Sequence, residues 1–171
     1  MDFKDRSIFI QILGSTEELL FCNYDLISKD WIRKQTISSL ISLYTGLVPK
    51  DQIDLFEKWI THARSCTEGK CHTPTIPSTE VTEPYFKHLT YWRGPVWVNT
   101  NWMIWLGLLK YYYNDAAERI RQGIFELAAN HGFREYCDPF TGRGLGEKSF
   151  SWTAALVIDI IKNRETQASS S

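Results

Sequence analysis

Segments with the period of an α-helix, interrupted by two long segments without any period, constrain the fold of this 171-residue chain more than any other feature. In the periodic segments apolar residues recur three and four positions apart, which lines one face of a helix. No comparable run alternates with the period of a β-strand. The sequence therefore predicts an all-α fold of five helices that pack as antiparallel α-hairpins. They span about 36–44, 50–64, 95–113, 115–131 and, from 149 or 151, to 162.

Residues that favour helix ends support these boundaries. Pro95 occupies a favoured first position of a helix, and Gly46 a favoured position just after one. The helix at 95–113 is apolar on most sides, which predicts burial on several faces. If part of the surrounding fold lies outside this chain, we expect the helix to expose a contiguous apolar patch. The β-branched segment 7–13 predicts a short strand or an extended entry. The polar segment 165–171 predicts a disordered tail.

The composition and charge exclude several classes of protein. Apolar residues make up 43% of the chain, with seven tryptophans, which argues against disorder. The formal net charge of −1 gives no electrostatic reason to bind nucleic acid or an anionic membrane. No apolar run reaches the length of about 18 residues that a membrane span needs, and segment 1–6 does not resemble a secretory signal. We therefore expect a soluble cytoplasmic protein without a membrane or nucleic-acid partner.

The cysteines leave three interpretations open. They are Cys22, Cys66, Cys71 and Cys137. A disulfide framework is not expected in a cytoplasmic chain of this size, so free thiols are the simplest interpretation. His62, Cys66, Cys71 and His72 could instead hold zinc in a small helical module, although their spacing matches no common structural zinc site. A disulfide between Cys66 and Cys71 is the third possibility.

The two aperiodic segments, 65–94 and 133–149, are loops that lie two helices apart along the chain. Loops as long as the first are unusual inside a compact domain and are commonly functional. If the helices alternate in direction, both loops lie at the same end of the fold. The sequence therefore predicts a site where the two loops meet.

The first loop ends in residues suited to binding a carbohydrate. Tyr91, Trp92 and Arg93 are followed by a Gly-Pro pair and then by Trp97 and Asn99. Aromatic faces stack on the C–H faces of a sugar ring, and guanidinium and amide groups hydrogen-bond its hydroxyls. Packing in a buried helix explains Trp102 and Trp105 better than sugar binding does, but it explains the loop residues less well.

The second loop places Glu135 between Phe133 and Tyr136. A carboxylate among aromatic rings can have its basicity tuned, which general-base chemistry needs. An ion pair of Glu135 with Arg134 or Arg93 is the alternative interpretation.

Three motifs in order resemble the C-terminal part of glycoside hydrolase family 63, in its mannosylglycerate hydrolase-like branch. They are Tyr-Trp-Arg-Gly-Pro-Val-Trp-Val-Asn at 91–99, Phe-Arg-Glu-Tyr-Cys-Asp-Pro-Phe-Thr-Gly at 133–142 and Phe-Ser-Trp-Thr-Ala-Ala at 150–155. The likeness extends back through Pro77 and Ser78 to about Asp25, so it covers most of the chain. Cys137 departs from the aromatic residue that the family commonly has there.

The resemblance implies a barrel of twelve helices, (α/α)6, and inverting hydrolysis of an α-glycoside without a cofactor or metal. It also implies that Glu135 is the general base. The substrate-binding candidates are Tyr91, Trp92, Arg93, Trp97, Asn99, Tyr136 and Trp152.

The family's general acid is an aspartate in a Trp- and Gly-rich upstream segment that has no counterpart in this sequence. We therefore expect residues 1–164 to be the C-terminal half of such a barrel and the chain alone to be inactive or nearly so. Its partners would be a sugar or α-glycoside and the missing N-terminal half, or a second copy bound through exposed apolar helices. A non-catalytic helical fragment that binds sugar or another protein is the alternative.

Overall fold

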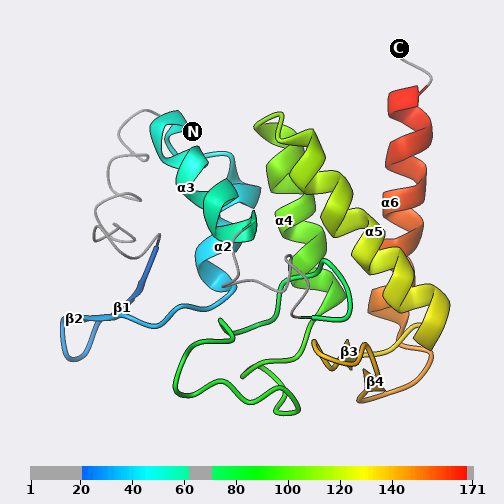
Figure 1. The fold of residues 1–171 in the computed structure, drawn as a ribbon. Coiled ribbons are helices and arrows are strands. Elements are labelled where there is room, and N and C mark those ends of the chain that lie inside the picture. The colour runs from blue at the N-terminus through cyan, green and yellow to red at the C-terminus, as the bar shows by residue number, and fades with distance from the viewer. Residues whose placement is uncertain (1–20, 62–70, 169–171) are drawn as a thin grey trace.

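The computed structural model describes residues 21–61 and 71–168, which form five helices and two small antiparallel sheets (Figure 1). The helices are α2 (Ser38–Thr45), α3 (Lys50–Thr61), α4 (Val98–Lys110), α5 (Asn114–His131) and α6 (Ser151–Ala168). The strands are β1 (Asn23–Asp25), β2 (Asp30–Ile32), β3 (Tyr136–Cys137) and β4 (Gly144–Leu145). The predicted helical architecture is confirmed, and the expected extended segment 7–13 lies outside the described residues.

Four short strands accompany the helices, and none of them was predicted from the sequence. β1 pairs with β2, where Tyr24 lies opposite Trp31, and β3 pairs with β4, where Tyr136 lies opposite Leu145. Each strand has only two or three residues. Such lengths are too short to show the alternation by which a strand is recognised in a sequence.

The prediction that Pro95 begins a helix is wrong, because α4 begins at Val98. The peptide groups before it are engaged elsewhere: the Pro95 carbonyl accepts a hydrogen bond from the Ser78 N–H (3.0 Å). Val96 donates to the Cys137 carbonyl (2.8 Å) and accepts from the Cys137 N–H (2.9 Å). Pairing between distant segments therefore overrides the local preference of proline.

Other helix ends agree with the sequence or move by a few residues. Gly46 and Gly132 follow α2 and α5 as expected, and Gly46 has a left-handed φ of 71°. α6 continues to Ala168, beyond the boundary at residue 164 where we expected a disordered tail to begin. None of the helices in the described part of the chain is long and apolar enough to cross a membrane.

The core is centred on α4, which packs against α2, α5 and α6 (Figure 1). Gly107 allows the close approach of α2, because a Cβ atom there would lie 2.6 Å from the Leu43 Cβ. Trp105 is buried, and Trp102 is partly buried with its Nε1–H donated to Asp159 (2.8 Å), so both belong to the helical packing as expected.

The predicted exposed apolar patch is not on α4. α2, α5 and α6 cover its apolar side chains, so that all of them are buried or half-buried. The exposed apolar residues of the helices lie mainly on α6 instead, and they include Trp152, Ile158 and Ile161.

The interpretation of the cysteines as free thiols is wrong for Cys71 and confirmed for Cys22 and Cys137. Cys71 is disulfide-bonded, whereas Cys22 and Cys137 are free and buried. The remaining cysteine, Cys66, and the proposed zinc ligand His62 lie outside the described residues. Among the residues that the structure does describe, no group of three or more potential ligands could hold a metal ion.

Candidate active site

The two long loops meet at one end of the helices, as predicted (Figure 1). The backbone of Val96 forms bridges with both Pro77 and Cys137, so three segments distant in sequence lie side by side. The His72 N–H also donates to the Pro139 carbonyl (2.9 Å). These contacts bring Trp92 and Glu135 to the same end of the molecule.

Three rings form a stack that we call the aromatic column: Trp92, Trp97 and Tyr136. The Trp92 and Trp97 centroids lie 4.0 Å apart with planes 8° apart, and the Trp97 and Tyr136 centroids lie 5.0 Å apart at 26°. Tyr91 meets all three rings edge-on. Stacked and edge-to-face contacts are the favoured geometries of aromatic pairs, so these four side chains support one another.

Tyr91 links the aromatic column to Glu135. Its hydroxyl donates to Oε1 of Glu135 (3.1 Å), and its carbonyl accepts from Trp97 Nε1–H (3.0 Å). Its φ of 30° is unusual for a bulky residue. The hydrogen bonds of its hydroxyl and its carbonyl hold the backbone in this conformation. The hydrogen bond to the Glu135 carboxylate raises the pKa of the Tyr91 phenol above its usual range, because it stabilises the protonated hydroxyl that donates the bond.

Glu135 is held at both of its carboxylate oxygens. Oε1 accepts from Tyr91, and Oε2 accepts from the backbone N–H of Glu147 (3.1 Å). Gly146, with φ of 63°, makes room for this arrangement, since a Cβ there would lie 2.7 Å from Tyr136 Cε1 and even closer to Oε2. The carboxylate is therefore oriented by donors that carry no charge.

The alternative interpretation of Glu135 as half of an ion pair is not supported. The Arg134 guanidinium donates to the Gly146 carbonyl (2.9 Å), and Arg93 is exposed. Among the described residues neither arginine forms an ion pair with Glu135. The carboxylate oxygens keep lone pairs beyond these two hydrogen bonds, so they can accept further hydrogen bonds.

The remaining predicted residues are not all part of this cluster. Trp97 is only 2% exposed, and Asn99 is buried with Oδ1 accepting the Thr100 N–H (2.9 Å). Both side chains are therefore buried, unlike those of Tyr91 and Trp92, which are exposed. Trp152 is half-exposed at the start of α6, where its ring lies 6.5 Å from that of Phe150.

Sequence reasoning missed two buried polar residues that shape the site. Asn101 is fully buried and bonds both the N–H and the carbonyl of Ile76, which fixes the first loop on α4. Asp138 is buried and accepts from the Phe140 N–H (3.1 Å) and the Thr141 hydroxyl (2.8 Å). The Asp-Pro-x-Thr spacing could have indicated this turn, because aspartate side chains commonly bond backbone two residues on.

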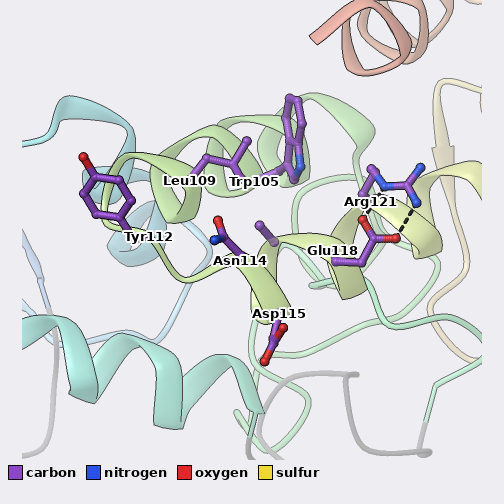
Figure 2. Close-up of a pocket in the computed structure, with 8 residues that line it drawn as sticks. Trp105, Leu109, Tyr112, Asn114, Asp115, Glu118 and Arg121 are labelled. Atoms are coloured by element: carbon purple, nitrogen blue, oxygen red, sulfur yellow. Dashed lines mark hydrogen bonds and ion pairs between the residues drawn. The ribbon is translucent and has the colours of Figure 1, made fainter. Parts of the chain in front are cut away.

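A separate pocket of about 480 Å³ lies at the turn between α4 and α5 (Figure 2). Its lining includes Trp105, Tyr112 and Asp115, and an ion pair between Glu118 and Arg121. α4 starts beside the loops that carry Glu135 and ends at this turn. The pocket therefore lies at the other end of α4 and shares no residue with the candidate active site.

Known proteins resemble most of this chain. Residues 11–153 match the family described as the mannosylglycerate hydrolase MGH1-like glycoside hydrolase domain. A mannosylglycerate hydrolase of Rubrobacter radiotolerans is 38% identical over 87% of this chain and 34% of its own length. A glucosylglycerate hydrolase of Mycolicibacterium hassiacum is 31% identical over 80% of this chain and 31% of its own length.

A solved structure extends the likeness to three dimensions. The GH63 mannosylglycerate hydrolase from Thermus thermophilus, crystallised in complex with Tris and D-glycerate, superposes with a TM-score of 0.81 at 32% identity. The match covers 88% of this chain and 36% of that protein. The chain thus spans about a third of the length of these relatives. Its matched residues and its fold show that it belongs to the MGH1-like glycoside hydrolases of family 63.

Proposed function

We propose that this chain supplies the general-base side of an inverting α-glycoside hydrolase, in which Glu135 accepts a proton from the attacking water. The observation that carries the proposal is the orientation of Glu135. Both oxygens are held by uncharged donors, beside exposed aromatic rings and without an ion pair among the described residues.

The reaction needs a second carboxyl group. As the water attacks the anomeric carbon, its proton passes to Glu135, and the bond to the leaving oxygen breaks. A general acid roughly 6.5–9.5 Å from the base protonates that oxygen on the opposite face of the sugar. We assign this acid to a part of a longer protein outside the 171 residues, in which residues 1–164 form the C-terminal portion of an (α/α)6 barrel.

The exposed residues of the site would hold the sugar. Trp92 is 43% exposed on the outer side of the aromatic column, and Tyr91 is 46% exposed. We assign both to sugar contacts, with Arg93 and Tyr136 bonding hydroxyls and Trp152 shaping the pocket wall. Trp97 and Asn99 would support the site without touching the sugar. Trp97 would do so as the central ring, which stacks against Trp92 and Tyr136.

The relatives indicate the class of substrate. Proteins that match most of this chain carry the names mannosylglycerate hydrolase and glucosylglycerate hydrolase. We therefore propose an α-hexosyl glycerate as the substrate. The contacts that choose between mannose and glucose would come partly from the rest of the protein.

The test compares the 171-residue chain with the same chain joined to its upstream reading frame, on mannosylglycerate and glucosylglycerate. We expect hydrolysis only from the longer protein, because the acid is absent from the shorter one. Glu135→Gln in the longer protein should lower kcat by about 10²–10⁴-fold, since it removes the proton acceptor. Glu118→Gln, a control in the part of α5 that lies away from Glu135, should leave kcat unchanged. Normal turnover by the Glu135→Gln variant would remove Glu135 as the base.

A non-catalytic role in binding sugar is the second candidate, favoured by the exposed indole of Trp92 in a chain that spans a third of its relatives. Titration of the 171-residue chain with mannosylglycerate, followed by tryptophan fluorescence, distinguishes the two. Binding without hydrolysis, even with the upstream segment present, would favour this role.

A further inference from the structure

Residues 87–94 form a closed loop that carries Tyr91, and we call it the Tyr91 loop. The Lys87 N–H donates to the Arg93 carbonyl (2.6 Å), the Thr90 N–H to the Lys87 carbonyl (2.9 Å) and the Arg93 N–H to the Thr90 carbonyl (2.6 Å). These bonds hold the loop together internally. The Trp97 Nε1–H bond to the Tyr91 carbonyl and the Gly94 N–H bond to the Ser78 hydroxyl attach the loop to its own side of the site. The position of Tyr91 relative to Glu135 depends in addition on contacts that reach the opposite segment.

His88 provides such an attachment. Its Nδ1 lies 3.1 Å from Oδ1 of Asp138, whose side chain is almost completely buried. His88 stands three residues before Tyr91, and Asp138 stands three residues after Glu135. The two hydrogen bonds, Tyr91 to Glu135 and His88 to Asp138, thus join the same two segments.

Asp138 is a fixed acceptor for this bond. Its backbone N–H donates to the Arg143 carbonyl (2.9 Å), and its neighbour Cys137 is paired with Val96. Burial by itself raises the pKa of Asp138, but hydrogen bonds from Phe140, His88 and Thr141 together lower it below the usual value. An ionised carboxylate only accepts hydrogen bonds, so the proton of the bond lies on His88 Nδ1.

We propose that His88 is a positioning residue whose Nδ1–H bond to Asp138 holds the Tyr91 loop in the place where the Tyr91 hydroxyl contacts Glu135. The effect of His88 on catalysis rests on the proposed function, whereas its role in positioning the Tyr91 loop does not. The ring of Phe140 packs on both Phe86 and His88, so ring packing is the competing explanation for how the loop is held.

Two substitutions separate these explanations. His88→Leu keeps apolar bulk against Phe140 but removes the donor, whereas His88→Asn keeps an N–H donor near the position of Nδ1. The readout is the pKa of the Tyr91 phenol in the 171-residue chain, followed by NMR of tyrosine labelled with carbon-13 at Cζ and assigned with Tyr91→Phe. His131→Leu, at a histidine on α5, is the matched control.

We expect His88→Leu to lower the pKa of Tyr91 toward its ordinary value, because the phenol loses its fixed place on the carboxylate. His88→Asn and His131→Leu should titrate like the wild type. An unchanged titration in His88→Leu would overturn the proposal, as would the same lowered pKa in His88→Asn and His88→Leu.

A measurement on the unsubstituted chain covers the case in which a variant does not fold. Nitrogen-15 NMR above the pKa of histidine should show the His88 tautomer with its proton on Nδ1, and a proton on Nε2 alone would overturn the proposal. In the longer protein, His88→Leu should lower kcat roughly tenfold with KM within about twofold, and His88→Asn should recover it. Absence of hydrolysis by the wild-type longer protein would count against the proposed function, while the NMR result still decides the role of His88.

Discussion

The helical core and the candidate active site are held together by different kinds of contact. In the core, α2 approaches α4 closely where Leu43 lies against Gly107, among buried apolar side chains that include Leu108. In the site, two loops are joined by hydrogen bonds such as Tyr91 to Glu135, and by rings that are partly exposed. Most of the stability should therefore lie in the core, while the geometry of the site depends on a few polar contacts.

Leu108→Ala gives the largest expected effect on stability. The side chain is 1% exposed between α4 and its neighbours, so its truncation leaves a cavity. The free energy of unfolding should fall by about 2–5 kcal/mol, measured by urea denaturation. The same truncation at the half-exposed Leu55 on α3 should cost much less, and equal losses at both positions would contradict the location of the core.

Asp138→Ala tests the polar framework between the loops. Removing a buried carboxylate that accepts three hydrogen bonds should cost about 1.5–3 kcal/mol at pH 7. The pKa of Asp138 is lowered on folding, so its contribution is present above the unfolded-state pKa and is lost as the pH falls through the folded-state value. The difference in stability between wild type and variant should therefore shrink at acidic pH, and a constant difference would show that the charge is not involved.

Tyr91→Phe gives the smallest expected effect on stability and sharpens the comparison most. It removes one exposed hydroxyl, so the free energy of unfolding should fall by no more than about 1 kcal/mol. In the longer protein kcat should fall roughly tenfold, because Glu135 loses one of the two donors that orient it. A large loss of stability with normal kcat would place Tyr91 in the structural framework instead.

The same tyrosine predicts a response to alkaline pH. The pKa of Tyr91 is raised on folding, so its hydrogen bond stabilises the chain fully below the ordinary tyrosine pKa. That contribution is lost as the pH rises through the raised folded-state value. Alkaline unfolding curves of wild type and Tyr91→Phe should therefore converge above about pH 10, the ordinary pKa of tyrosine, and parallel curves there would argue against the bond.

Much of the site could be predicted from local sequence, and the reasons for the misses are physical. The density of aromatic residues around Arg93 and the carboxylate at Glu135 identified two loops that the structure joins. Burial was not predictable: Trp97 lies between two other rings contributed by different loops. The bond between His88 and Asp138 joins residues 50 positions apart, so neither loop alone contains its signal.

The sequence by itself determined the helical segments, the two long loops and the family, because helix period and ordered motifs are written in neighbouring residues. Tertiary structure alone decided that Pro95 and Val96 are extended, since Val96 pairs with Cys137 from the second loop. It also decided which apolar helix is covered, because α4 lies among three helices whereas α6 keeps Ile158 half-exposed. Local patterns specify what a segment can form, and the path of the whole chain specifies which neighbours it meets.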